Sequence, residues 1–564
     1  MSLPRLATGH IFRLPSIIVD SRQVVQDKVI VIGLDGATFN ILDPLLEKGL
    51  LPNLAGLIEE GTRGILSSTL PPMTAPAWAS FMTGVNPGKH GLFNWRTRFQ
   101  DTKETWVSTN NIHSAKLWDI LSEAGHRVGV MGVPLTYPPQ PVNGFLVSGM
   151  LTPNKEVEYT YPLSVKQEVE EMAQGYVIDV DIEGENRDLG TTRGIESLLR
   201  ELEEATEKRT RATMHLWRRV RPTLLVVFYE MPDRIQHGLW RYADLSMELS
   251  SEADRLRREL VMSSFASLDR AIGEWVRIAD SNTTIFLMSD HGFCFQDSRL
   301  YLNRWLAEKG FLKYKSGVLG ARRGLRRTMR HIKGFLPRRW FMYSRGLVDT
   351  ASVDWPNTLA HAGMPTEYAI YINLEGREPQ GVVRPGKAYL SLREDIRQEL
   401  LGLTDPRTGR SVIKEAFLRE EIYQGPYVDS APDILFQLEP GYLATHTSAS
   451  GDFVQDVSSE GRGCHAKEGI IVAAGPHIAQ GRAIAEAHII DLAPTILHVV
   501  GLPVPKSMDG RVLSELFTPQ FQEERPVTFE ESRSKEEPKS HKGVYSTKEE
   551  SAIEERLRGL GYLD

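Results

Sequence analysis

Cysteine is scarce in this chain of 564 residues, which contains only Cys294 and Cys464. So few thiols argue against the kind of disulfide framework that holds small secreted domains together. Both cysteines lie close in the sequence to the candidate metal ligands described below.

Long apolar runs are missing as well. No run reaches the roughly eighteen apolar residues that a membrane span needs, so we expect no membrane-spanning helix and no membrane contact. The first residues, MSLPRLATGHIFRLPSIIVDSRQ, lack the continuous apolar core of a signal peptide. We therefore expect a cytoplasmic protein.

An excess of positive charge is also absent. The chain has 66 Lys and Arg residues against 73 Asp and Glu residues, and its net charge of -7 argues against general nucleic-acid binding. One stretch departs from this balance: Arg322, Arg323, Arg326, Arg327, Arg330, Lys333, Arg338 and Arg339. This basic run is either a solvated helical face, which is the usual meaning of such a run, or a surface that attracts an anionic substrate.

The order of strand-like and helix-like segments predicts the fold class. Runs typical of strands buried on both faces occupy residues 28–34, 127–133, 224–229, 284–288 and 470–474. Segments with helical spacing or helix-end signals occupy residues 43–60, 75–83, 114–124, 192–220 and 491–500. This alternation predicts an α/β fold with a mostly parallel central sheet and helices on both faces.

Composition divides the chain into four expected parts. Residues 1–27 form an N-terminal arm, and residues 28–299 together with 431–520 form one catalytic domain. Residues 300–430 contain the basic run and the strand-like segment AIYINLEG, and we interpret them as an inserted cap over the site. Residues 521–564 form a Lys/Glu/Ser-rich tail with a terminal helix.

Thr74 is the candidate nucleophile. It follows two prolines in the segment PPMTAPAW, residues 71–78, and precedes a short helix that Gly84 ends. Because prolines do not occupy helix interiors, we expect Thr74 at the helix N-cap, where the positive end of the dipole stabilises an alkoxide or a phosphate oxygen. An isolated threonine here would be only a cap, but metal-ligand residues elsewhere in the chain favour a nucleophile.

Six residues with metal-ligand chemistry accompany Thr74, and most follow a predicted strand: Asp35, Asp233, His237, Asp290, His291 and His465. In parallel sheets, ligands bind beyond the carboxyl ends of the strands. Asp233 and His237 are four residues apart, so they share one face of a helical turn. Carboxylates combined with imidazoles suit zinc, with manganese as the alternative, and six ligands suit two ions that act together in phosphoryl transfer.

Several segments together resemble the alkaline phosphatase superfamily: GLDGAT (33–38), MTAPAWASFMTG (73–84), PGKHG (87–91), MPDRIQH (231–237), SDHGF (289–293) and CHAKEGIIVAAGP (464–476). They are most similar to its type I phosphodiesterase/nucleotide pyrophosphatase branch, and within it to predicted phosphohydrolases or phosphomutases of prokaryotes. INLEGREP (372–379) and RLRGLGYLD (556–564) are similar to the same proteins. The resemblance covers residues 28–520.

This resemblance implies a role for each candidate residue. Thr74 would attack phosphorus and form a covalent phospho-enzyme, which water then hydrolyses. Asn94 would be the asparagine that donates a hydrogen bond to a phosphoryl oxygen. The two metal sites would consist of Asp35, Asp290 and His291 with the Thr74 oxygen, and of Asp233, His237 and His465.

The sequence therefore predicts a two-metal hydrolase of phosphodiester or pyrophosphate bonds in a small anionic substrate. The alternatives are a phosphomutase or phosphomonoesterase on the same site, and a catalytically silent metal-binding interaction protein. A sulfatase is not expected, because Thr74 and Trp78 stand where those enzymes need Cys or Ser and Arg. The apolar neighbours of Thr74 favour a diester over the more highly charged monoester. The sequence leaves the physiological substrate and the oligomeric state open.

Overall fold

The computed structural model describes residues 26–98, 104–182, 187–315, 353–364, 366–447, 451–531 and 544–559. The basic run at residues 322–339 lies outside these ranges. Within them, nine strands form a central sheet in the order β20-β2-β19-β9-β1-β8-β5-β6-β7. These strands are β1 (Lys28–Leu34), β2 (Thr62–Ser67), β5 (Val128–Met131), β6 (Gly144–Val147), β7 (Thr160–Tyr161), β8 (Leu224–Tyr229), β9 (Thr283–Met288), β19 (Glu468–Ala474) and β20 (Arg482–His488).

Most of this sheet is parallel. Strands β9, β1, β8, β5 and β6 run in one direction, and β2 pairs in parallel with β20. β19 is antiparallel to both of its neighbours, and β7 is antiparallel to β6. Every residue of β8 and β9 is buried, as the uninterrupted apolar runs require. The predicted mostly parallel α/β fold is confirmed.

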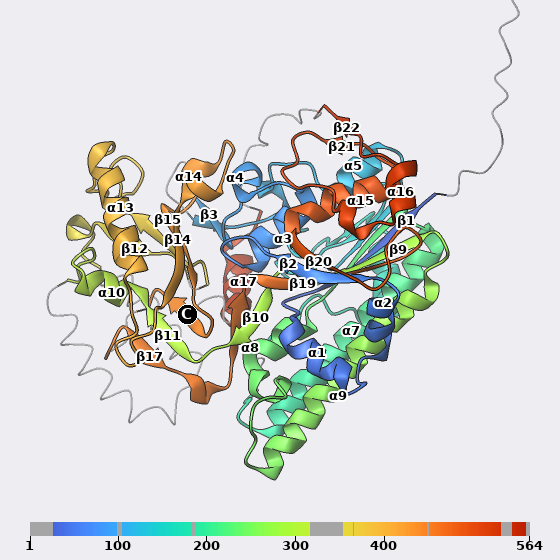
Figure 1. The fold of residues 1–564 in the computed structure, drawn as a ribbon, viewed down its shortest axis with the longest axis horizontal. Helices are drawn as coiled ribbons and strands as arrows, with labels where there is room; N and C mark the ends of the chain where they lie inside the picture. Colours follow the sequence, from blue (N-terminus) through green and yellow to red (C-terminus); the bar gives the residue numbers. More distant parts are fainter. Residues whose placement is uncertain are drawn as a thin grey trace, which may run out of the picture.

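Helices cover both faces of the sheet (Figure 1). One face carries α3 (Thr74–Thr83), α5 (Leu117–Glu123) and α15 (Leu492–Val500). The other carries α2 (Pro52–Glu59), α7 (Thr192–Val220), α8 (Met231–Ala243) and α9 (Glu252–Ile278). The long helix α7 buries a stripe at helical spacing that includes Ile195, Leu198, Leu199 and Leu202.

Two helix starts differ from the sequence-based expectation. Helix α3 has Met73 at its N-cap, so Thr74 is its first helical residue rather than its cap. Gly84 ends it in the left-handed conformation, as predicted. Helix α1 (Phe39–Glu47) begins after Thr38 and contains Asp43 and Pro44, which we expected at a helix start. It starts earlier because the Thr38 hydroxyl accepts a hydrogen bond from the Asn40 N–H at 3.3 Å.

The described residues between positions 298 and 456 form a second lobe with an apolar core of its own, at the left of Figure 1. One small sheet combines β11 (Ser298–Tyr301), β16 (Tyr442–Thr445) and β17 (Val454–Asp456). Another combines β12 (Ala360–Ala362), β13 (Ala369–Ile372), β14 (Ile413–Leu418) and β15 (Ile434–Leu438), with α10 (Leu302–Glu308) and α13 (Lys387–Leu401) nearby. An antiparallel ladder, β10 (Gly292–Phe295) with β18 (Gly463–Ala466), joins this lobe to the central sheet, and we call it the neck.

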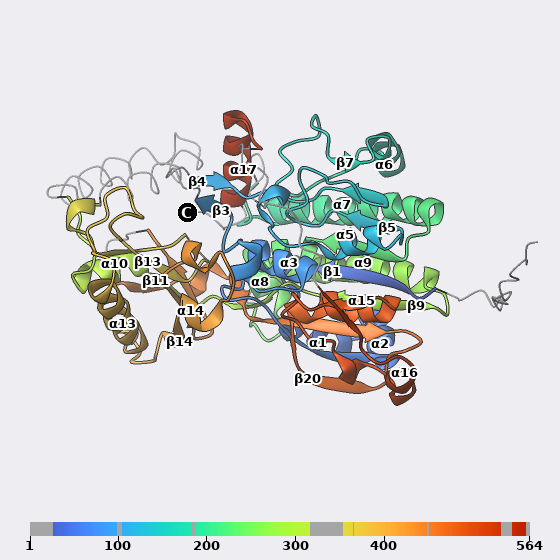
Figure 2. The ribbon, with the colours of Figure 1, turned by 90° about the horizontal axis from the view of Figure 1, so that it is seen from above.

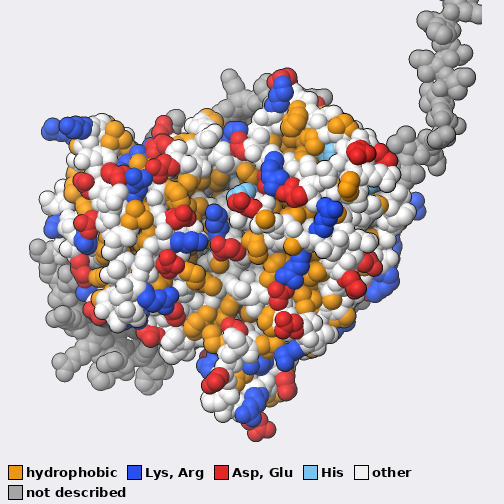
Figure 3. Space-filling model, viewed as in Figure 1, with side chains coloured by type: hydrophobic (Ala, Val, Ile, Leu, Met, Phe, Trp, Pro, Cys, Tyr) orange, Lys and Arg blue, Asp and Glu red, His pale blue; other side chains and the backbone are white. Residues whose placement is uncertain are grey.

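Near the end of the chain, α17 (Thr547–Gly559) lies beside the hairpin of β3 (Arg96–Arg98) and β4 (Glu104–Trp106), as Figure 2 shows. Arg96 and Glu554 form an ion pair at 3.6 Å across this contact. Acidic and basic side chains are intermixed on the face shown in Figure 3. None of the helices in the described ranges combines the length and the apolar character that crossing a membrane requires.

Candidate metal centre

All eight predicted site residues are described, and six of them, the candidate metal ligands, come from chain segments that follow or flank central strands. Asp35 comes directly after β1, and Asp290 and His291 come after β9. The first two turns of α8, which follows β8, carry Asp233 and His237. His465 lies on β18, and Thr74 opens α3. The carboxyl ends of β1, β8 and β9 meet at one edge of the sheet, because these strands are parallel neighbours.

Asp35, Asp290 and His291 form the first group, and all three are fully buried. The Nε2 atom of His291 lies 3.6 Å from Oδ1 of Asp35 and 3.5 Å from Oδ2 of Asp290. The backbone N–H of Gly36 donates to Oδ1 of Asp290 at 3.2 Å, which leaves Oδ2 facing the group. The Thr74 hydroxyl oxygen lies 3.3 Å from the same His291 Nε2 atom. The predicted first site is therefore a compact set of potential ligand atoms.

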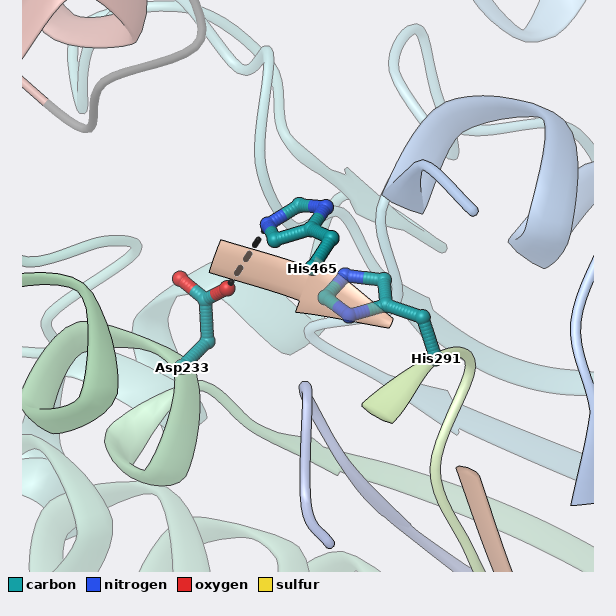
Figure 4. A group of neighbouring side chains, drawn as sticks. All are labelled: Asp233, His291 and His465. Carbon is teal, nitrogen blue, oxygen red and sulfur yellow. Dashed lines mark ion pairs between the residues drawn. The ribbon is translucent and has the colours of Figure 1, made fainter. Parts of the chain in front are cut away.

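Asp233, His237 and His465 form the second group. Oδ1 of Asp233 lies 3.3 Å from Nε2 of His237 and 3.6 Å from Nε2 of His465. The two imidazole Nε2 atoms are 3.0 Å apart. Figure 4 shows that His291 adjoins this group, and ligand atoms of Asp233, His291 and His465 lie within 4.8 Å of one another. The two groups therefore abut, with His291 between them.

The donor atoms of this centre have the chemistry that divalent cations need. Both carboxylate oxygens of Asp35, Oδ1 of Asp233 and Oδ2 of Asp290 are buried and accept no hydrogen bond from the described residues. Burial, and then the neighbouring Asp290 and Asp233 carboxylates, raises the pKa of Asp35 well above its usual value. Burial also raises the pKa of Asp290 to about 6. Buried carboxylates that repel one another, and that each keep at least one oxygen without a hydrogen-bond donor, fit a site for cations.

Two backbone carbonyls orient the imidazoles. Nδ1 of His465 lies 2.9 Å from the Pro72 carbonyl oxygen, and Nδ1 of His291 lies 3.1 Å from that of Gly292. A carbonyl only accepts hydrogen bonds, so each Nδ1 carries the proton and each Nε2 presents its lone pair to the candidate metal centre. Pro72 is two residues before Thr74, so this contact also connects the segment that leads into Thr74 to the neck.

A buried arginine that the sequence analysis did not select holds Asp233. Arg234 is fully buried and donates from Nη1 to Oδ2 of Asp233, while its Nη2 pairs with Oδ1 of Asp179 at 3.0 Å. Burial alone would raise the pKa of Asp233, but His237 and Arg234 outweigh it and hold that pKa well below its usual value. Arg234 thus occupies one oxygen of Asp233 and leaves the other to the histidines. Its position directly after a candidate ligand, Asp233, was the only sequence signal for it.

Asn94 lies at the contact between the two lobes. Its side-chain N–H donates to Oε1 of Glu367 at 2.7 Å, and its oxygen accepts from the Arg96 N–H at 2.6 Å. Glu367 is fully buried and also accepts from the Tyr371 hydroxyl at 2.6 Å. The residues on either side of Glu367, Thr366 and Tyr368, have positive φ angles of 64° and 48°. No sequence motif marks Glu367, because its role depends on how the second lobe docks.

These features define the class of protein: an α/β fold with a candidate two-ion centre at the carboxyl edge of its sheet, beside a buried threonine hydroxyl. The chain belongs to the type I phosphodiesterase / nucleotide pyrophosphatase family, whose profile matches residues 29–469. This membership confirms the predicted branch of the alkaline phosphatase superfamily. It supports hydrolysis of phosphodiester or pyrophosphate bonds.

Solved structures with a similar fold share little sequence with this chain. Phosphonoacetate hydrolase from Sinorhizobium meliloti 1021, in complex with phosphonoformate, superimposes with a TM-score of 0.51 at 15% identity, over 84% of this chain and 95% of that one. An inactive variant of murine ectonucleotide pyrophosphatase / phosphodiesterase 5, in complex with AMP, gives 0.47 at 14% identity, over 87% of this chain and 100% of that one. A search of curated proteins gave no significant match. The phosphonoacetate hydrolase comparison supports the α/β fold assignment.

Proposed function

We propose that this protein hydrolyses phosphodiester or pyrophosphate bonds of a small anionic substrate, using two divalent metal ions and Thr74 as nucleophile. The observation that carries the proposal is the pair of abutting Asp/His groups, with the Thr74 hydroxyl 3.3 Å from the histidine between them. Zinc suits this mixture of carboxylates and imidazoles, and manganese is the alternative. When bound, the two ions would neutralise charge on the attacking and leaving oxygens.

The protein's own groups position the reaction. Asp35, Asp290 and His291 would hold one ion, and Asp233, His237 and His465 the other. Thr74 lies at the first turn of α3, where the positive end of the helix dipole favours an alkoxide. Attack of its oxygen on phosphorus would expel the alcohol or phosphate leaving group and form phospho-threonine, which water then hydrolyses.

Asn94 would donate to a phosphoryl oxygen. One of its two side-chain N–H bonds is directed to Glu367, which leaves the second for a ligand. Glu367 would then set the orientation of the amide. Through this contact, the docking of the second lobe would affect the position of the transferred group.

Two measurements test the proposal together. Elemental analysis should find about two zinc or manganese ions per chain. The zinc-loaded and manganese-loaded enzymes should both cleave bis-p-nitrophenyl phosphate with a higher kcat/KM than p-nitrophenyl phosphate, because the apolar segment after Thr74 supplies no extra cation for a monoester.

Each alternative predicts a different result. A clear preference for the monoester with both metals would identify a phosphatase or phosphomutase. Bound metal without turnover of either ester would identify a silent metal-binding protein. Absence of zinc and manganese, with no activity on adding either, would contradict the two-ion centre.

A further inference from the structure

The neck between the two lobes contains both cysteines of the chain. The chain enters the second lobe through β10 and returns from it through β18, and these two strands pair antiparallel. Their register places Cys294 opposite Cys464 and, one step along, Phe293 opposite His465. The thiols therefore lie beside a candidate metal ligand, on the ladder that joins the lobes.

The two thiols are placed for bond formation. Their Sγ atoms are 3.5 Å apart. Directly opposed residues in antiparallel strands have Cα atoms about 4.5–5.5 Å apart, which is inside the range of roughly 4.4–6.8 Å that disulfides accept. Only a small rotation of the side chains separates this pair from the S–S bond length of about 2.05 Å.

The surroundings of the two cysteines favour a disulfide between them over a disulfide with another molecule. Cys464 is buried and its thiol points toward the Tyr442 carbonyl oxygen on β16, at 3.8 Å. Cys294 is only half-buried, so it is the more accessible residue of the pair. Since the chain has no third cysteine, each cysteine can form an intramolecular disulfide only with the other.

We propose that Cys294 and Cys464 form a reversible dithiol–disulfide site that fastens the neck. Hydrogen peroxide or a small disulfide is the oxidant. With peroxide, two S–H bonds break, one S–S bond forms, and the two electrons and two protons reduce peroxide to two waters. With a small disulfide, the Cys294 thiolate attacks it and releases one thiol, and Cys464 then displaces the second.

Oxidation links two residues that are 170 positions apart in the sequence. The closed loop contains the whole second lobe, so the bond removes much of the freedom of the unfolded chain and stabilises the folded one. The disulfide would also fix two strands next to the candidate metal centre: β18, which carries His465, and β10, which begins directly after His291. The site thus couples the redox state of the surroundings to the junction between the lobes.

The experiment uses the full chain, first reduced and then exposed to hydrogen peroxide or to oxidised dithiothreitol. We expect both free thiols to disappear on oxidation. The peptides that contain Cys294 and Cys464 should be recovered as one linked species, lighter by two hydrogens than the two reduced peptides together. The chain should remain unlinked to any other chain. The midpoint of thermal unfolding should rise and return to its first value after reduction. Cys294→Ser and Cys464→Ser are matched controls that should show no shift.

Three results would overturn the proposal: two thiols that persist after treatment, added oxygen instead of lost hydrogen, or a disulfide between two chains. An unfolding midpoint equal in the oxidised and reduced protein would also overturn it, because the neck would not be fastened. None of these readouts uses a phosphate ester. Failure here is therefore distinguishable from failure of the proposed hydrolysis.

Discussion

At the residue scale, Thr74 combines complete burial, a place in the first turn of α3 and contact with His291. We predict that Thr74→Ala lowers kcat for a diester by about three orders of magnitude or more, because a covalent mechanism loses its nucleophile. The metal content should remain close to two ions, because the other ligands are unchanged. Thr74→Ser, which keeps a hydroxyl, should retain measurable turnover. Near-normal rates for the alanine variant would remove Thr74 from the mechanism.

Arg234 supports a second prediction at this scale, since it joins Asp233 to Asp179 in a buried chain of charges. We expect Asp179→Asn to loosen Arg234 and lower zinc affinity by roughly 10- to 100-fold, the usual effect of losing a group that orients a metal ligand. Competition with a chromophoric chelator measures this affinity without substrate. Glu168→Gln, which breaks a half-exposed pair with Arg219, is the control. Equal zinc affinity in both variants would exclude this role.

At the element scale, His90 fastens the short helix α4 (Pro87–His90) to α3, because its Nε2 lies 3.0 Å from the Ser80 hydroxyl oxygen. His90 is fully buried, and burial, with a smaller effect of His113, lowers its pKa to about 3. The folded state thus keeps His90 neutral while the unfolded chain binds a proton below about pH 6.5. The stability that this neutral imidazole contributes is present above that pH and is lost as the pH falls.

We predict that lowering the pH from about 7 to about 5 decreases the free energy of unfolding by about 2 kcal/mol through His90 alone. His90→Gln retains a side chain that can bond to Ser80 and does not titrate. Its metal-loaded form should be less stable than the wild type at neutral pH but should lose less stability on acidification. Denaturant unfolding at the two pH values measures the difference. Parallel losses in the two proteins would show that His90 does not contribute to acid lability.

At the scale of the whole molecule, the two lobes meet through polar contacts as well as the neck. The Tyr423 hydroxyl of the second lobe donates to the Leu70 carbonyl, four residues before Thr74. The Tyr427 ring stacks on His113 with the ring centres 4.3 Å apart. Together with the Asn94–Glu367 bond, these contacts place the second lobe against the segments that carry the proposed nucleophile, Thr74, and the proposed phosphoryl ligand, Asn94. Substrate selection is therefore expected to depend on this lobe.

The basic run at residues 322–339 falls within the sequence of that lobe but outside the described residues, so its position near the site stays a prediction. If it attracts an anionic substrate, neutralising Arg326, Arg327 and Arg330 together should raise KM and flatten its salt dependence, with little change in kcat. The matched control replaces Arg255 and Arg270 of α9 with Gln. Unchanged kinetics in the triple variant would identify the run as ordinary solvated surface.

The sequence by itself determined the class of fold and the residue types of the candidate site. Short apolar runs rich in β-branched and aromatic residues are typical of strands buried on both faces, and they predicted β8 and β9 almost to the residue. Asp35, Asp233 and Asp290 follow such strands, and parallel strands bring their carboxyl ends to one edge. Local chain signals therefore contained enough information to predict that these three carboxylates would lie near the same edge of the sheet.

Only the tertiary structure decided the contacts between residues that no motif connects. The grouping of His291 with both sets of ligands, the buried Arg234–Asp179 pair and the Asn94–Glu367 bond all depend on how distant segments pack. The antiparallel direction of β19 also depends on packing, because hydrophobic pattern is the same for either direction. No sequence motif pairs Cys294 with Cys464, and only the neck register brings their thiols together. Pattern specifies which face of an element is buried, whereas register and docking decide which side chains touch.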